Sequence, residues 1–255
     1  MSRKAHHIEG VLFDLFGTLF VYGDMKRAWQ DWIDDIRQGL VRIGLHLTNA
    51  DVSKACDGFF SGSLIPNLGL TVYETRIQRL AVSLGGVPSN SWCQLLATQS
   101  MLRWQAQITL DPEAAPTLRQ LRENGIRVGV LSNFDHEPHV LHILRQAGLT
   151  DLLDCIMVSG AVGLKKPDPA IFQLALTKLG TIASQTIFLG DHPEQDFAGA
   201  HAAGLQAILL ERSASGVDRL QMNYYADLSH GLDDGADQLS QRKIGSLLEI
   251  FSQLR

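Results

Sequence analysis

The second half of the sequence alternates short apolar runs with stretches of helical spacing, and this alternation restricts the fold more than any other feature. The helical stretches are ten or so residues long, which is enough to connect parallel strands in βαβ units. An earlier apolar run, residues 8–13, ends at a Gly-Thr turn and is predicted to be a buried strand of the same sheet. The later strands are expected at 126–133, 154–160, 186–191 and 205–211, and the helices at 112–124, 139–147, 168–180 and 195–204.

The region between the first strand and this alternating half has a different character. Residues 22–106 are predicted to be all helix, with one apolar stripe formed by Met25, Trp29, Ile33, Ile36 and Leu40. The sequence therefore predicts a helical domain, 22–106, inserted into an α/β domain made of 1–21 and 107–255. The polar tract 213–241 gives no clear prediction, and 244–254 is predicted to be a closing helix.

Composition excludes several classes of protein. With 22 basic and 27 acidic residues the net charge is -5, so the chain lacks the basic surface expected for nucleic-acid binding. Three scattered cysteines indicate neither a disulfide framework nor a zinc site. We find no signal peptide and no apolar run near the ~18 residues that a membrane helix needs. We therefore expect a cytoplasmic protein without membrane or nucleic-acid partners. The sequence leaves open whether it is a monomer or a homodimer.

Polar residues follow the predicted strands where each strand ends. Taken one at a time, these residues are ordinary turn formers, helix caps or solvated charges. Ligands of open α/β sheets, however, bind at the carboxyl ends of the strands, so residues in these positions are expected to converge. Their order and complementary charge favour one shared site. The residues are Asp14, Ser132, Asn133, Lys166, Asp191 and Asp196.

This set of side chains suits phosphoryl chemistry. Neighbouring carboxylates repel one another, and Mg²⁺, a hard cation with oxygen ligands, relieves that repulsion. A lysine and a hydroxyl hold an anionic group, and a carboxylate such as Asp14 attacks phosphorus to form an aspartyl-phosphate. Backbone N–H groups in the turn that contains Gly17 and Thr18 are expected to cradle the phosphate.

Four segments of the sequence resemble the motifs of the haloacid dehalogenase (HAD) superfamily of hydrolases. "DLFGTL" resembles the first motif, "LSN" the second, "KKPDPAIF" the third and "GDHPEQD" the fourth, and the resemblance covers about residues 8–212. "SNFDHEPHVLHIL" is similar to the subgroup that carries an α-helical cap after the first motif. The resemblance implies an α/β fold, a Rossmann-like parallel-sheet core with an inserted helical cap domain.

The resemblance also implies roles for individual residues. Asp14 would be the nucleophile, with Lys166 as its catalytic partner and as a ligand of the phosphoryl group. Ser132 would bind the same group, and we place Asn133 beside it in the substrate site. Asp191 would be a ligand of Mg²⁺.

Further implied roles involve the fourth motif and the first turn. Asp196 would be a metal ligand or would support one. The backbone carbonyl of Phe16 would complete the metal site together with the Asp14 carboxylate. Phe16, Gly17 and Thr18 would line the phosphate site.

Phe16 is the one clear departure from the phosphatases of this superfamily, which usually have a second aspartate at this place. That aspartate protonates the leaving group and later activates water, and general acid–base catalysis is worth about 10²–10⁴-fold. The sequence therefore predicts a slow or selective Mg²⁺-dependent phosphatase that acts on a small phosphate monoester. His136 and His192, beside the second and fourth motifs, are candidate replacements.

Three alternatives use the same residues. A metal-independent 2-haloacid dehalogenase also lacks the acid, but the two acids of the fourth motif would then repel the nucleophile. A phosphonoacetaldehyde hydrolase would need a lysine in the helical domain, for which Lys54 is the formal candidate. A non-catalytic HAD-fold binding or regulatory protein would have little reason to keep its buried charges. The sequence does not identify the substrate.

Overall fold

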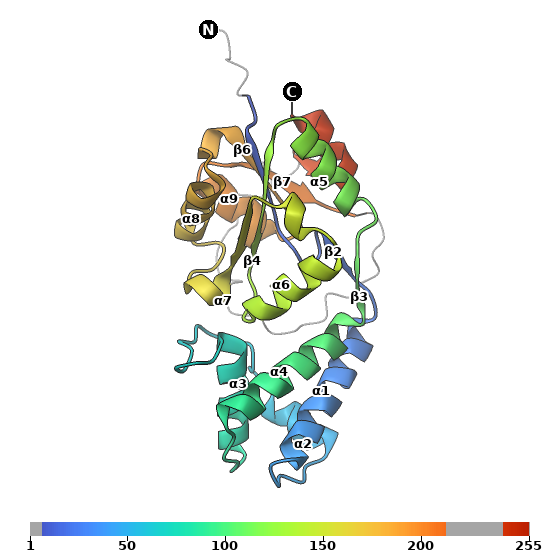
Figure 1. Cartoon of the computed structure of the whole chain (residues 1–255), viewed down its shortest axis with the longest axis vertical. Helices are drawn as coiled ribbons and strands as arrows, with labels where there is room; N and C mark the ends of the chain where they lie inside the picture. Colours follow the sequence, from blue (N-terminus) through green and yellow to red (C-terminus); the bar gives the residue numbers. More distant parts are fainter. Residues whose placement is uncertain (1–6, 213–241, 255) are drawn as a thin grey trace.

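The structure is a computed structural model that describes residues 7–212 and 242–254, so the polar tract 213–241 lies outside it. The described chain contains a six-stranded, fully parallel sheet in the order β5-β4-β1-β6-β7-β8 (Figure 1). The predicted strands are thereby confirmed, with β1 at the centre between β4 and β6. The strands are β1 (Gly10–Phe13), β4 (Arg127–Ser132), β5 (Cys155–Val158), β6 (Thr186–Gly190), β7 (Gln206–Leu210) and β8 (Lys243–Ile244).

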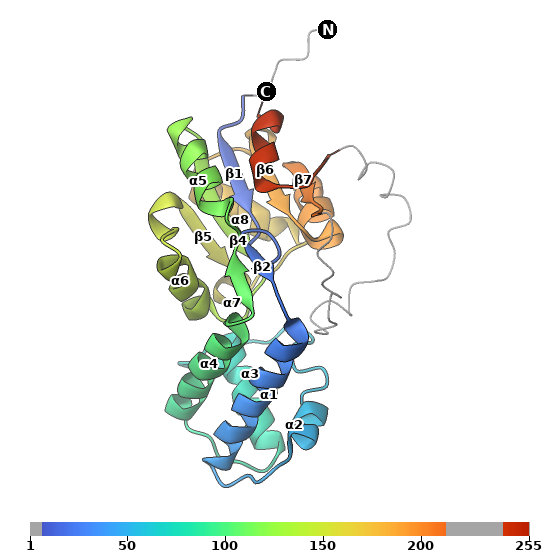
Figure 2. The same cartoon turned by 90° about the vertical axis from the view of Figure 1, so that its right-hand side faces the viewer.

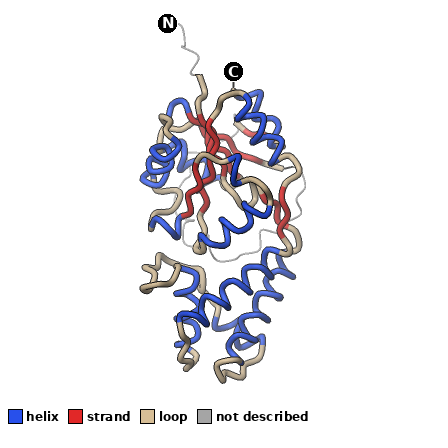
Figure 3. The backbone as a smooth tube through the Cα atoms, viewed as in Figure 1, coloured by secondary structure: helices blue, strands red, loops and turns tan. Residues whose placement is uncertain are grey.

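Helices cover both faces of the sheet (Figure 3). Because side chains alternate along a strand, Val11 and Phe13 of β1 face one apolar cluster, whereas Leu12 faces the other. The first cluster is closed by α5 (Ala114–Glu123), α6 (Glu137–Gln146) and the 3₁₀ helix η5 (Leu247–Gln253), and the second by α8 (Pro169–Leu179) and α9 (Gly199–Ala202). Short helices complete the connections: η1 (Thr150–Leu152), α7 (Ser159–Val162), η2 (Ala183–Gln185) and the π-helix η3 (Pro193–Ala198).

The boundaries of α8 show how local sequence fixes an element. Asp168 caps its first turn, with a carboxylate oxygen that accepts from the Ala170 amide at 2.9 Å, and Pro169 occupies the first helical position. Gly180 ends the helix at φ 75°, in the left-handed region that glycine enters without strain. The sequence-based prediction for this helix is confirmed.

A helical insert, which we define as residues 25–105, lies beyond the end of the sheet (Figures 1 and 2). Two antiparallel strands, β2 (Phe20–Tyr22) and β3 (Ile108–Leu110), connect it to the sheet region. In its interior, the Trp32 indole donates to the Tyr73 hydroxyl at 2.6 Å, and that hydroxyl lies 2.8 Å from the Ser100 hydroxyl. The helices of the insert are α1 (Met25–Val41), α2 (Asn49–Ala55), α3 (Val72–Ser83) and α4 (Asn90–Gln105).

Three predictions need correction. Residues 22–106 are not all helix, because Tyr22 belongs to β2 and residues 56–71 form turns and loops. The helix expected over 195–204 is divided between the π-helix η3 and α9, and 244–254 begins as the end of β8 before the 3₁₀ helix η5. The pair β2–β3 and strand β8 were missed because strands of two or three residues are too short to show a period. No helix within 7–212 or 242–254 is both long and apolar enough to cross a membrane.

Candidate active site

Three neighbouring strands bring the predicted residues to one edge of the sheet. Asp14 directly follows β1, Ser132 is the last residue of β4, and Asp191 directly follows β6. Because β4, β1 and β6 are adjacent and parallel, these positions share the carboxyl edge. The helical insert lies beyond the same edge (Figure 2). The convergence expected from the sequence is therefore present.

Lys166 lies at the centre of the cluster and bridges two carboxylates. Its Nζ atom donates to Oδ1 of Asp14 and to Oδ1 of Asp196, each at 2.6 Å. The three side chains are almost fully buried, with 2%, 9% and 2% of their surface exposed for Lys166, Asp14 and Asp196. A buried lysine with two carboxylate partners satisfies the rule that buried charges are paired.

Burial and charge act against each other at Asp14. Burial raises the pKa of this carboxyl, the Lys166 ammonium lowers it, Asp196 raises it, and the result is a pKa of about 6. Burial lowers the pKa of Lys166, but the two carboxylates outweigh it and the net shift is upward. The lysine is therefore charged at neutral pH, and Asp14 is held as a carboxylate mainly by this cation.

Two glycines allow the acidic side chains to approach the backbone. Gly17 has φ 91°, and a β-carbon there would overlap the Asp191 carboxylate. A β-carbon at Gly190 would overlap the Asp196 carboxylate in the same way. Glycine is needed at both positions because the carboxylate of Asp191 or Asp196 already occupies the space where a β-carbon would lie. The Thr18 hydroxyl completes this turn, 3.3 Å from Oδ2 of Asp14.

The carboxylates present fit a divalent cation. Asp14, Asp191 and Asp196 each offer one oxygen, and these three oxygens all lie within 4.8 Å of one another. Hard carboxylate oxygens are the ligands that Mg²⁺ prefers. The Lys166 ammonium pairs with Asp14 and Asp196, and the three carboxylate oxygens together are a donor set that suits a hard cation.

The Asn133 side chain forms hydrogen bonds with the main chain of Lys166, which the sequence did not predict. Its side-chain amide donates to the Lys166 carbonyl at 2.9 Å and to Gln195 Oε1 at 2.8 Å, and its Oδ1 accepts from the Lys166 amide at 2.8 Å. Asn133 thus fixes the main chain of Lys166. Its role in binding substrate stays a prediction, as does that of Ser132, the buried last residue of β4.

Phe16 is packed into an aromatic cluster. Its ring centroid lies 4.8 Å from that of Phe134, 5.2 Å from that of Trp104 in α4, and 6.3 Å from that of Phe20. Phe134 follows β4, so the cluster joins the sheet edge to the helical insert. The side chain at position 16 is thus surrounded by apolar rings.

The two histidines considered as replacement acids have other partners. His136 is buried, its Nδ1 lies 3.0 Å from the Thr71 hydroxyl, and burial lowers its pKa. The Nδ1 of His192 accepts from the amides of Glu194 and Gln195 at the start of η3. Because it accepts these hydrogen bonds, Nδ1 of His192 carries no proton that it could donate to a leaving group. Lys54 is exposed on α2.

Arg212 and Asp111 also contact the site's backbone, and sequence reasoning missed both. Arg212 follows β7 and donates to the carbonyl oxygens of Gly17 and Thr18, 195 and 194 residues earlier in the chain. No local pattern signals a contact over such a separation. Its position just after a predicted strand was the one available clue.

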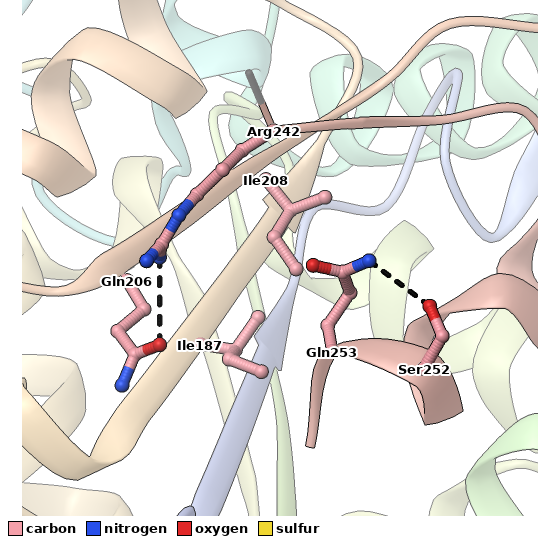
Figure 4. Close-up of a pocket in the computed structure, with 6 residues that line it drawn as sticks. All are labelled: Ile187, Gln206, Ile208, Arg242, Ser252 and Gln253. Carbon is pink, nitrogen blue, oxygen red and sulfur yellow. Dashed lines mark hydrogen bonds between the residues drawn. The ribbon is translucent and has the colours of Figure 1, made fainter. Parts of the chain in front are cut away.

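A surface pocket lies elsewhere, near the beginnings of β6 and β7 and the end of η5 (Figure 4). It contains none of the predicted site residues. Within it, Nη1 of Arg242 donates a hydrogen bond to Oε1 of Gln206 at 3.4 Å. The pocket is lined by Ile187, Gln206, Ile208, Arg242, Ser252 and Gln253.

Comparison with known proteins agrees with the geometry of the carboxyl edge. Residues 8–204 match the model of the haloacid dehalogenase-like hydrolase family. The chain belongs to the haloacid dehalogenase-like hydrolase family. A phosphatase of Mycobacterium tuberculosis is 35% identical over 210 residues, which cover 81% of this chain and 88% of that protein.

Two further proteins resemble this chain, one over about half of its length and the other over nearly all of it. Ribulose-1,5-bisphosphate 5-phosphatase of Halopiger xanaduensis is 33% identical over 138 residues, and the match spans only 51% of this chain and 56% of that relative. The 2-haloacid dehalogenase of Pseudomonas syringae superposes with a TM-score of 0.62 at 23% identity, covering 97% of this chain and 98% of that one. This last likeness shows the common HAD fold alone.

Proposed function

We propose that this HAD-family chain is a Mg²⁺-dependent phosphatase of small phosphate monoesters. The observation that carries the proposal is the cluster of three carboxylates at the carboxyl edge of the sheet, two of which contact the buried Lys166. Relatives named as phosphatases, from Mycobacterium tuberculosis and Halopiger xanaduensis, support it.

The proposed reaction has two displacements at phosphorus. A carboxylate oxygen of Asp14 attacks phosphorus, the ester P–O bond breaks, and the leaving oxygen departs with its electron pair. Water then attacks the phosphorus of the aspartyl-phosphate, and the Asp14 carboxylate and inorganic phosphate are released. Lys166 and Ser132 are proposed to hold phosphoryl oxygens. Asp14, Asp191, Asp196 and the Phe16 carbonyl would hold Mg²⁺, which supplies charge neutralisation.

The aromatic cluster around Phe16 determines which substrates are expected to react fastest. A phenylalanine cannot donate a proton to the departing oxygen, and Trp104 and Phe134 enclose its ring. Leaving groups that depart as stable anions need no such proton, so the first displacement, and with it kcat/KM, is expected to be faster for aryl than for alkyl phosphates. Water activation lacks the same group, so hydrolysis of the aspartyl-phosphate is expected to be slow.

We infer that residues 22–106 act as a cap domain over a core of 1–21 and 107–255. The contacts between the two regions lie next to the site. Arg76 of α3 forms an ion pair with Asp135 at 2.7 Å, and the Tyr73 amide donates to the Asp135 carbonyl at 3.1 Å. Such a cap would exclude water from the reacting groups. Cytoplasmic location and the choice between monomer and homodimer stay predictions.

The test is phosphate release from a panel of monoesters, with Mg²⁺ or with EDTA, by the wild type and by Asp14→Asn. p-Nitrophenyl phosphate and an alkyl phosphate give the leaving-group comparison. The expected result is Mg²⁺-dependent release that Asp14→Asn abolishes, with preference for the aryl ester. Equal release by Asp14→Asn would assign the activity to a contaminant.

Absence of phosphate release would contradict the proposal and lead to two other readings. Chloride released from 2-chloropropionate without metal would establish a dehalogenase. That reading is disfavoured because the Asp191 and Asp196 carboxylates would repel a metal-free nucleophile at Asp14. Release of neither ion would favour a non-catalytic binding protein.

A further inference from the structure

Arg212 forms hydrogen bonds with the main chain of the turn that follows Asp14. Its guanidinium donates to the Gly17 carbonyl at 2.5 Å and to the Thr18 carbonyl at 2.7 Å. The same group forms an ion pair with Oδ2 of Asp111 at 2.6 Å. The arginine side chain is 19% exposed and that of Asp111 is 10% exposed, so most of this contact is shielded from water. A planar guanidinium with several fixed donors is suited to hold three acceptors at once.

These two carbonyl contacts set the direction of the neighbouring amides. A trans peptide is planar, so the C=O of one residue and the N–H of the next point to opposite sides. With the Thr18 carbonyl held by Arg212, the Leu19 amide points away and donates to the Leu15 carbonyl at 2.9 Å. With the Gly17 carbonyl held, the Thr18 amide also points away from Arg212.

The Thr18 amide has no acceptor among the described residues, although Thr18 is fully buried. Buried backbone N–H groups are nearly always paired, so an unpaired one needs a ligand or water. The hydroxyl of the same residue lies 3.3 Å from Oδ2 of Asp14, which places this residue at the reacting carboxylate. An anionic oxygen bound beside Asp14 is a suitable acceptor.

We propose that Arg212 is a positioning residue, which holds the Gly17–Thr18 turn so that the Thr18 amide is available to an anionic substrate oxygen. This inference rests on the proposed phosphatase function, because the anion is the phosphoryl group. Within the described residues Arg212 makes no hydrogen bond to Asp14; it acts through the main-chain carbonyls of Gly17 and Thr18.

The ion pair with Asp111 extends this effect to the link with the helical insert. Asp111 directly follows β3, and its amide donates to the Leu19 carbonyl at 2.9 Å. Arg212 therefore joins three parts of the chain: the end of β7, the turn after β1 and the return from the insert.

The experiment compares Arg212→Ala and Arg212→Lys with Arg122→Ala, a matched control. Arg122 also contacts a carboxylate, Asp154 at 2.8 Å, but on α5 and away from the site. With p-nitrophenyl phosphate and Mg²⁺, Arg212→Ala is expected to lower kcat/KM about 10- to 100-fold, the scale of loss from small misplacements. Arg122→Ala should change it less than twofold.

Two readouts separate positioning from general destabilisation, and a further variant covers the case of poor folding. Guanidinium ion at millimolar concentration should restore part of the activity of Arg212→Ala and none in Arg122→Ala. Arg212→Lys should keep the melting temperature but not the full kcat, because a single ammonium nitrogen cannot reproduce the planar spacing of the two guanidinium nitrogens that contact the carbonyls and Asp111. The double variant Asp111→Asn/Arg212→Ala avoids a buried unpaired carboxylate if Arg212→Ala folds poorly.

A readout that needs no turnover distinguishes failure of this inference from failure of the proposed function. Amide hydrogen exchange of residues 15–20 should be faster in Arg212→Ala than in the wild type and unchanged in Arg122→Ala. If the wild type releases no phosphate but this difference is present, the function proposal fails and Arg212 still positions the turn. Unchanged exchange, or equal activity losses in Arg212→Ala and Arg122→Ala, would overturn the inference.

Discussion

Replacement of Lys166 by methionine tests the electrostatic basis of the site. The ammonium lies 2.6 Å from both Asp14 and Asp196, and all three side chains are at least nine-tenths buried. Lys166→Met keeps most of the volume but leaves two buried carboxylates without a cation. Loss of one partner from a buried ion pair costs about 3–5 kcal/mol, so we expect a loss of that size in the free energy of unfolding at pH 8.

The loss should depend on pH, because the variant can relieve the repulsion by taking up a proton. The folded pKa of Asp14 is about 6 against an ordinary value of 3.8, so its contribution to stability is present below pH 3.8 and is lost as pH rises through 6. Lys166 lowers this pKa, so its removal raises the pKa of Asp14 further and keeps the carboxyl protonated at pH 5. The destabilisation by Lys166→Met should therefore be at least about 1 kcal/mol smaller at pH 5 than at pH 8.

The assay is urea unfolding in EDTA at pH 5 and pH 8, with Lys165→Met as the control. Lys165 is the exposed neighbour of Lys166, so its replacement should change stability by less than about 0.5 kcal/mol at either pH. Equal destabilisation of Lys166→Met at both pH values would refute the argument that paired buried charges define this site. A loss below about 1 kcal/mol at pH 8 would do the same.

Three other outcomes follow from single contacts. Gly17→Ala should abolish activity, whereas Gly44→Ala, at a similar φ of 85° but with nothing within 4 Å, should cost only about 1–2 kcal/mol; assays of activity and melting temperature separate the two. Burial lowers the pKa of His139 to about 3, so folding stability should fall as pH drops through 6.5, by about 2 kcal/mol between pH 8 and pH 5. His139→Gln should flatten urea-monitored stability over that range, and the exposed His201→Gln should not. Phe16→Asp should reduce the ratio of kcat/KM for aryl over alkyl phosphates; an unchanged ratio would show that a proton donor at this place is irrelevant.

The main strands of the sheet were predictable because each has a local sequence signal. Short apolar runs followed by Asp14, Ser132 or Asp191 give both the strand and its end. Parallel pairing then places those ends at one edge, and this step requires no knowledge of side-chain packing. The positions of the charged residues were therefore accessible from the sequence, as was the departure at Phe16.

The rest depends on contacts between distant parts of the chain. The aromatic neighbours of Phe16 come from α4 and from the loop after β4, and no periodicity specifies that they meet. Arg212 reaches Gly17 across 195 residues. Asn133, predicted at the substrate, was found to hold the main chain of Lys166, because an amide at a strand end has several acceptors within reach.

A covalent intermediate on Asp14 is the central claim, and acid quenching tests it most directly. Enzyme mixed with Mg²⁺ and a ³²P-labelled aryl phosphate is quenched in acid, digested and analysed for a labelled peptide. Because Phe16 cannot activate water, the account predicts that label accumulates on Asp14 in a burst and is absent from Asp14→Asn. Phosphate release at full rate by Asp14→Asn, or label that persists in that variant, would contradict it.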